Sequence, residues 1–314
     1  AHPAPVPAVP AQAAARPAGL DLLVLALSVT VLTYVCRIQD IFPVFAAVRL
    51  PILGALGALG LYFLDGDRRR AFKTNKHPVT RMVWVIMILA VASVPTSVHD
   101  GMSFFFIRDD LGKNFLLTLI LAASIRTFTD VRRYTTTLLI GAFAFALHVY
   151  IYVPVGQNGR LGDLVYYDAN DLGMLMVCSM PLALFFLLRG RNAIAKLAAG
   201  GAMFLFLLII IKSGSRGAFL GLIAVAAYVL FGFSSLSKGF RLTAVVAAFA
   251  GLMSLGSDQY WTLMKSLTSP KDDYNWDSDA GRRQVWKGGM GYIFDRAITG
   301  VGVFAFPVAE GTLS

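Results

Sequence analysis

The sequence predicts an all-α polytopic membrane protein with about nine transmembrane helices. Three observations support this class: 57% of the 314 residues are hydrophobic, only 15% are charged, and the mean hydropathy is +0.66. Soluble domains carry roughly a quarter of charged residues, and a helix needs roughly 17–25 apolar residues to cross a bilayer core. The composition therefore excludes an ordinary soluble domain.

Nine apolar segments are long enough to span. The second carries Arg49 and Pro51 and the fourth is short, so these two depart most from the pattern. Glycine and proline inside several segments are compatible with spanning helices, because neighbouring helices can satisfy the freed backbone groups. In chain order the segments are 20–36, 43–64, 82–98, 111–125, 135–153, 172–188, 194–211, 217–233 and 240–256.

The segments divide the chain into three parts. Residues 1–19, rich in Ala and Pro and lacking a basic start, predict a disordered cytoplasmic tail rather than a signal peptide. Residues 20–256 form the transmembrane helical domain. Residues 257–314 are more polar, bear Trp and Tyr, and predict the start of a large external loop. Because no polar tail follows the final Gly-rich stretch, we expect the chain to be truncated.

Basic residues predict a cytoplasmic N-terminus. With the N-terminus inside, the cytoplasmic loops 65–81, 126–134, 189–196 and 234–241 hold 14 Lys and Arg, whereas the four external loops hold six, counting Lys113 at the edge of the fourth span. Cytoplasmic loops of membrane proteins are enriched in these residues. Topology thus accounts for the net charge of +10, and nucleic-acid binding is not indicated. The external side then comprises 99–110, 154–171, 212–217 and everything after about 257.

Three arginines on the expected external side are candidate ligands for an anion: Arg160, Arg216 and Arg282. A guanidinium matches phosphate oxygens in a two-pronged geometry and keeps its proton. Each arginine taken singly is also compatible with an anchor to lipid head groups or to a nearby Asp.

Arg216 has the most favourable setting of the three. Ser213, Ser215 and Gly217 surround it with small side chains, so that a phosphate could approach the backbone closely. Arg216 also opens an apolar helix, whose N-terminal end carries a partial positive charge.

The run Asp168, Asn170 and Asp171 has two interpretations. These residues could bind a metal or position an acceptor. Alternatively they begin the sixth span, with Asn170 as its N-cap and Asp171 favoured by the helix dipole.

A calcium loop starting at Asp273 is disfavoured, because Ser278 and Gln284 replace the Gly and Glu that such a loop needs. We expect no metal site, and no disulfide between Cys36 and Cys178, which both lie in or beside apolar helices.

Three motifs in series resemble the O-antigen ligase and polymerase superfamily. They are Tyr167-Asp-Ala-Asn-Asp-Leu-Gly-Met174 with Met180-Pro-Leu182, then Ser213-Gly-Ser-Arg-Gly-Ala218, then Gly281-Arg282 with Trp286 and Ile298-Thr-Gly-Val-Gly302 before Phe304. The resemblance covers roughly residues 160–306.

The resemblance implies a metal-independent glycosyltransferase of the GT-C type in the bacterial inner membrane, without a cofactor. Such enzymes move a glycan from a polyprenyl pyrophosphate donor to a hydroxyl of an acceptor, which is lipid A core, a protein or a glycan, on the outer face. Ligase and polymerase are not distinguished. By this resemblance Arg216 and Arg282 would be catalytic. The substrate-binding candidates are Arg160, Ser213, Ser215, Gly217, Asp168, Asn170, Asp171 and Arg283.

The family also implies a histidine later in the large loop, as the base for the acceptor hydroxyl. His2, His77, His99 and His148 do not match that position. We therefore expect the base beyond Ser314, or an inactive fragment.

The alternative function is a flippase or transporter for lipid-linked glycans. Such proteins place ionisable residues near the bilayer midplane, often at broken helices. The spans here are nearly free of charge apart from Arg49, which favours the transferase. A purely structural membrane protein would leave the outward arginines unexplained.

Overall fold

The computed structural model is helical. It describes residues 21–65, 77–156, 159–162, 164, 167–190, 192–232, 236–269, 282–297 and 300–313. In this part of the chain the only β-structure is an isolated bridge between Val155 and Leu161. The prediction of an all-α chain is confirmed for the described residues. The predicted tail 1–19 and the weak calcium-loop candidate at 273–279 lie outside them.

The helices follow the predicted apolar segments closely from α8 to α12, and less closely before α8. The helices are α1 (Leu22–Tyr34), α2 (Ile38–Ile41), α3 (Pro43–Ala47), α4 (Leu50–Leu64), α5 (Pro78–Ala92), α6 (Asp100–Phe106), α7 (Gly112–Ser124), α8 (Phe128–Tyr152), α9 (Ala169–Arg189), α10 (Ala193–Ser213), α11 (Arg216–Ala227), α12 (Lys238–Leu255), α13 (Asp258–Lys265), α14 (Arg282–Asp295) and α15 (Phe306–Leu313). A 3₁₀ turn η3 (Val94–Thr96) and two π turns, η4 (Ile107–Leu111) and η5 (Tyr228–Gly232), extend α5, α6 and α11.

Five helical stretches of the described chain are long and apolar enough to cross a membrane. These are Pro78–Thr96, Phe128–Tyr152, Ala169–Arg189, Ala193–Ser213 and Lys238–Leu255. Leu22–Tyr34, Leu50–Leu64 and Arg216–Gly232 are apolar but shorter. A polytopic membrane protein is therefore supported, and the predicted total of nine spans is not.

Two segments depart from the predicted plan. The second span is broken between α3 and α4, because Arg49 adopts a left-handed conformation (φ 53°) just before Pro51. The expected external loop 99–110 was wrong as a loop: α6, η4 and α7 form one almost continuous helix. His99 starts it as an N-cap, since its Nδ1 accepts from the Met102 N–H at 3.1 Å.

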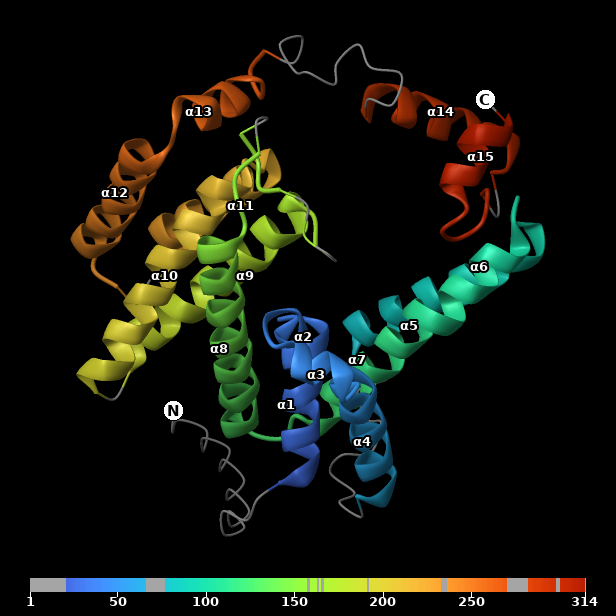
Figure 1. Cartoon of the computed structure of the whole chain (residues 1–314), viewed down its shortest axis with the longest axis horizontal. Helices are drawn as coiled ribbons and strands as arrows, with labels where there is room; N and C mark the ends of the chain where they lie inside the picture. The colour runs from blue at the N-terminus through green and yellow to red at the C-terminus, as the bar shows by residue number, and fades with distance from the viewer. Residues whose placement is uncertain are drawn as a thin grey trace, which may run out of the picture.

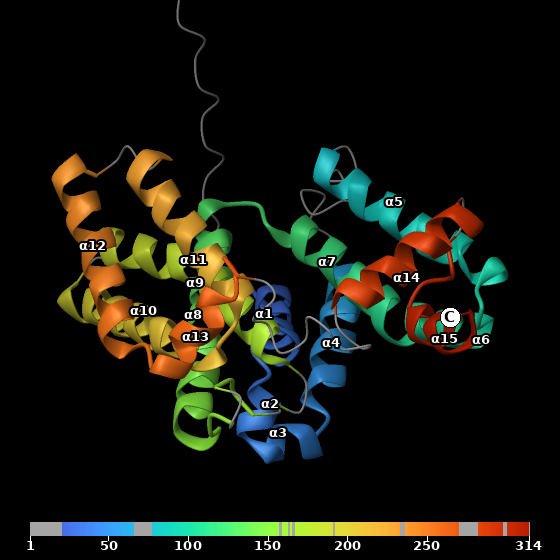
Figure 2. The same cartoon turned by 90° about the horizontal axis from the view of Figure 1, so that it is seen from above.

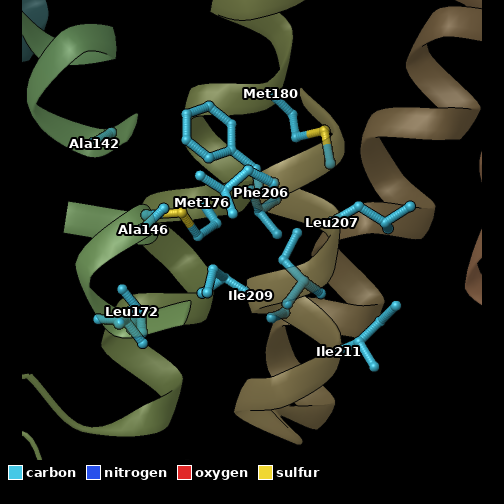
Figure 3. Packing of buried hydrophobic residues seen from close by; sticks show 14 of the residues in the cluster. Ala142, Ala146, Leu172, Met176, Met180, Phe206, Leu207, Ile209 and Ile211 are labelled. Atoms are coloured by element: carbon cyan, nitrogen blue, oxygen red, sulfur yellow. The ribbon is translucent and has the colours of Figure 1, made fainter. Parts of the chain in front are cut away.

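The main core lies between α8, α9 and α10. Figure 3 shows Ala146 of α8, Leu172 and Met176 of α9, and Phe206 and Ile209 of α10 meeting in one apolar cluster. Leu172, Met176, Phe206 and Ile209 are fully buried. By contrast α5 and α12 leave most of their apolar side chains exposed, as expected for faces that contact lipid.

Two bodies of helices flank α1 in Figures 1 and 2. Helices α8 to α13 lie on one side of α1, and α5 to α7 lie on the other with α14 and α15. Helix α1 packs against both α4 and α8. The Tyr167 hydroxyl, just before α9, also donates to the Val35 carbonyl at 2.6 Å. The start of α9 is thereby fixed to the end of α1.

Arg296 and residues 300–304 dock on the connection between α5 and α6. Ser103 Oγ donates to the Val303 carbonyl at 2.6 Å, and the Val98 N–H donates to the Val301 carbonyl at 3.0 Å. Phe106 and Phe304 stack with ring centroids 4.5 Å apart. At Gly302 (φ 99°) a Cβ would overlap Ser97, so only glycine fits there. The Gly-Val-Gly motif, Gly300 to Gly302, therefore packs against the connection between α5 and α6.

Candidate functional site

The N-terminus of α9 is capped by Asp168. Its Oδ1 accepts from the backbone N–H groups of Asn170 (2.7 Å) and Asp171 (2.8 Å), while Asp171 reaches back to the Asp168 N–H at 3.5 Å. The expectation that Asn170 is the N-cap was wrong, because the helix starts one residue before it, at Ala169. Burial alone would raise the pKa of Asp168, but these N–H donors, the Asn170 amide and the Arg160 charge together lower it.

Asn170 does not cap α9, so its side-chain amide is available to link Arg160 in the loop before α9 to Ser215 at the start of α11. Its Oδ1 accepts from Arg160 Nη2 at 3.2 Å and from Ser215 Oγ at 2.9 Å. Its Nδ2 donates to Asp168 Oδ2 at 3.1 Å. One side chain therefore joins the loop before α9, the N-terminus of α9 and the N-terminus of α11.

The Ser213–Arg216 turn connects α10 to α11 with buried serines. Ser213 Oγ donates to the Ile210 carbonyl (2.7 Å) and accepts from the Ser215 N–H (3.2 Å), and Ser215 Oγ caps α11 at the Ala218 N–H (3.1 Å). Gly214 closes α10 in a left-handed conformation, φ 58°. Ser213 and Ser215 are 0% and 1% exposed, so they build the turn and are hidden from solvent.

Close packing brings the N-termini of α9 and α11 together. A Cβ on Gly173 would lie 2.6 Å from the Ala218 Cβ and 3.3 Å from Ser215 Cβ. Only glycine therefore lets the two helices approach so closely. Two helix N-termini, each with a partial positive charge, thus lie side by side.

Helix α13 covers this pair. Arg216 Nη1 donates to Ser266 Oγ at 3.0 Å, just after α13 ends. Phe219 of α11 meets Trp261 of α13 edge to face, with centroids 6.5 Å apart. The built Cβ of Gly214 lies 3.0 Å from Leu263 Cδ1. Arg216 is therefore held between its own helix and α13.

The structure brings most of the predicted site residues together. Arg160, Asp168, Asn170, Asp171, Ser213, Ser215, Arg216 and Gly217 gather at the N-termini of α9 and α11. Arg282 and Arg283 begin α14, which lies with α5 and α6 on the other body in Figures 1 and 2. Arg283 is exposed, and the side chain of Arg282 lies outside the described part of the structure.

An apolar cavity of about 380 Å³ opens between α9, α10, α11 and α12. Phe219 and Leu222 line it from α11, and Met180, Leu207 and Phe240 line it from the other three helices. Phe219 is the residue one helical turn after Arg216. The cavity therefore starts directly beneath the arginine and runs along the apolar part of the helices.

Comparison with known protein families gives a match to part of this arrangement. Residues 201–312 match the O-antigen ligase family model. Over these residues the chain is similar to O-antigen ligases. The matched part includes Arg216, α13 and the Gly-Val-Gly motif, and the helices around it agree with a multi-pass membrane protein. No curated protein and no solved structure is significantly similar to the chain.

The O-antigen ligase match covers about a third of the chain and begins after α9. The motif from Tyr167 to Met174, which we included in the resemblance, lies outside it. Asp168 and Asn170 are therefore connected to the matched part by geometry alone, through the hydrogen bond between Asn170 and Ser215.

Two contributors to the site were not predicted from the sequence: α13 and Ser266. A signal for α13 existed, because Ser257 followed by Asp258 is a common helix start and apolar residues recur at Tyr260, Trp261 and Met264. The contact between Ser266 and Arg216 joins residues far apart in the chain, so no local pattern could have shown it.

Because Asp168 caps α9, we expect its contribution to the stability of the protein to depend on pH. Asp168→Ala should destabilise the protein by about 1 kcal/mol, the usual cost of losing an N-cap. Because the folded state lowers the pKa of Asp168, its contribution is present above the unfolded pKa of about 4 and is lost as the pH falls through the folded pKa. Thermal unfolding in detergent at pH 7 and pH 3 should show the wild-type advantage over Asp168→Ala shrinking at the lower pH. Asp168→Asn should retain most of the cap, and its difference from Asp168→Ala should not depend on pH.

Replacing Tyr260 of α13 by Phe is expected not to lower the stability of the protein. Its side chain is 1% exposed, its hydroxyl has no hydrogen-bond partner among the described residues, and burial raises its pKa to about 12. A buried hydroxyl without a partner costs free energy. Tyr260→Phe should therefore leave the melting temperature unchanged or raise it. A clear decrease would show that the hydroxyl has a partner in the membrane-embedded protein.

Proposed function

We propose that this protein transfers a glycan from a polyprenyl pyrophosphate donor to an acceptor hydroxyl on the periplasmic face of the bacterial inner membrane. The O-antigen ligase family implies a glycosyltransferase-like enzyme. The observation that carries the finer proposal is the pairing of Arg160 and Arg216 with the N-termini of α9 and α11 through Asn170 and Ser215.

Fixed positive charge at this place suits the chemistry of the leaving group. Breaking the bond between the sugar and the pyrophosphate leaves negative charge on the pyrophosphate oxygens. Preorganised donors and dipoles that face developing charge stabilise a transition state most effectively. Arg216 supplies a permanent charge at a helix N-terminus, and the Ser266 hydroxyl holds one of its guanidinium nitrogens in place.

The carboxylates of the site do not cancel this charge in full. Asp168 is ionised, but its oxygens already accept from the N–H groups of α9 and from the Asn170 amide. The carboxylate therefore acts mainly on the helix start and on Arg160. Within the described residues, no three His, Cys, Asp or Glu side chains lie together in a way that could hold a metal ion. In our proposal, arginine carries out the charge stabilisation.

The apolar cavity beneath Arg216 supports a lipid-linked donor. A polyprenyl chain needs an apolar path that starts at the pyrophosphate. The cavity begins at Phe219, close to Arg216, and continues between α10, α11 and α12. Arg282 begins α14 on the α5–α6 side, so in our proposal it acts on the same pyrophosphate only if the large loop brings α14 to Arg216. His99 is not placed to act as the base for the acceptor hydroxyl, because it lies on the α5–α6 side and its Nδ1 accepts from the Met102 N–H.

Reconstitution of the full-length protein tests the proposal. Proteoliposomes would receive a fluorescent polyprenyl-pyrophosphate glycan together with a panel of acceptors: lipid A core, a protein and a free glycan. We expect glycan transfer to one acceptor, unaffected by EDTA, with free polyprenyl pyrophosphate as the second product. Movement of labelled donor between leaflets without any product would support the flippase instead. No transfer to any acceptor would contradict the transferase.

A further inference from the structure

A second cavity lies at the opposite end of the α8–α9 pair from Asp168 and Asn170. It has a volume of about 410 Å³ and is formed where α8 begins and α9 ends. Its lining includes two arginines, Arg132 of α8 and Arg189 of α9. The rest of the lining is apolar or aromatic apart from two threonines. The apolar and aromatic lining residues are Phe128, Val131, Leu182, Phe185 and Phe186.

The two arginines bring uncompensated positive charge to this cavity. Asp130 is the only acidic residue of α8, and its Oδ2 accepts from the backbone N–H of Thr127 (3.0 Å) and from the Thr127 hydroxyl (3.0 Å) as part of the helix cap. The only acidic residue of α9, Asp171, is at the far end. In the described part of the chain, neither Arg132 nor Arg189 forms an ion pair.

Aromatic residues place the arginines against an apolar surface. The Arg132 guanidinium carbon lies 5.8 Å from the centroid of the Phe186 ring, in a cation–π contact. Phe128 is 86% exposed and Phe185 is 46% exposed. Large exposed rings beside guanidinium groups are typical of the boundary between bilayer core and head groups.

We propose that this cavity binds the phosphate of an anionic phospholipid between Arg132 and Arg189, with the acyl chains along Val131, Leu182 and Phe185. Basic pockets between membrane helices are suited to anionic head groups. A free phosphate ion would satisfy the arginines but would leave the exposed Phe128 and Phe185 rings unused. This inference is independent of the transfer reaction, because the cavity shares no residue with the Arg216 site.

Lipid binding to the purified full-length protein tests the proposal. The protein in detergent would be titrated with phosphatidylglycerol, and bound lipid would be counted by native mass spectrometry. We expect Arg132→Gln/Arg189→Gln to weaken phosphatidylglycerol binding about tenfold or more, from the typical contribution of two surface arginines. Arg81→Gln/Arg133→Gln removes the same charge without touching the cavity and should bind as the wild type does.

A second variant separates shape from charge. Thr135→Trp fills the cavity and keeps both arginines, so it should also lose the lipid while its melting temperature confirms folding. Phosphatidylcholine should bind at least tenfold more weakly than phosphatidylglycerol, and an equal concentration of inorganic phosphate should not displace bound lipid. Equal binding of both lipids, unchanged binding by the two cavity variants, or displacement by phosphate would overturn the proposal.

Discussion

Arg216→Ala should reduce glycan transfer by the full-length protein by at least about a hundredfold, the usual effect of removing one donor that stabilises transition-state charge. Arg216 opens α11, lies beside the Asn170–Ser215 bridge and is held by Ser266 at 3.0 Å. The loss should appear in kcat, since the charge develops only as the pyrophosphate leaves. Transfer would be measured as product formed per minute in proteoliposomes.

Arg216→Lys distinguishes the two-pronged shape of the guanidinium from its charge alone. Lysine keeps the positive charge but cannot present two parallel N–H groups to a pyrophosphate, so it should restore only part of the activity. Arg108→Ala is the matched control, because Arg108 is exposed and pairs with its neighbour Asp109 at 2.8 Å on the other body. That variant should transfer normally. Full activity of Arg216→Ala would disprove the role of this arginine.

Gly214→Val should destabilise the protein by about 2–5 kcal/mol, the combined cost of a side chain in a left-handed conformation and of overpacking. Gly214 has φ 58°, and a Cβ there would lie 2.9 Å from both the Arg160 Cγ and the Gly159 carbonyl oxygen. The new side chain would push the Arg160 loop and α13 away from the turn. Activity should fall with stability, because Arg160 and Arg216 would separate.

Gly201→Val provides the control for this substitution in the same helix. Nothing lies within 4 Å of a Cβ at Gly201, which is exposed in the middle of α10. Valine is favoured over glycine inside a helix by a few tenths of a kcal/mol. Thermal unfolding in detergent should therefore show no loss for Gly201→Val and a marked loss for Gly214→Val. Equal melting temperatures for the two variants would contradict the packing argument.

Hydropathy predicted the helices from α8 to α12 well, because each is one continuous apolar run between polar connections. It failed where a helix depends on a single backbone conformation. The left-handed residue Arg49 divides the second segment, and the cap at His99 converts an expected loop into α6. Neither event changes the average hydropathy of its segment, so a pattern of apolar residues could not reveal it.

The site was predicted as a set of residues but not as an arrangement. The phosphate chemistry of arginine and the small residues beside Arg216 led to Arg160, Ser213 and Ser215. The bridging role of Asn170 depends on Asp168 taking the cap, which follows from a shift of the helix start by a single residue. The cover over Arg216 depends on contacts between residues 50 apart in the chain. Local sequence preferences carry no information about such contacts.

The contacts of α13 also have a consequence for the order of assembly. Gly159 is packed against Gln259 and Gly214 against Leu263, and both contacting residues are synthesised after α8 to α12. Until α13 arrives, the Arg160 loop and the Ser213–Arg216 turn lack one wall. A nascent chain would therefore expose its arginines before it could hold them. The arrangement at the N-termini of α9 and α11 is therefore complete only once α13 has packed against both turns.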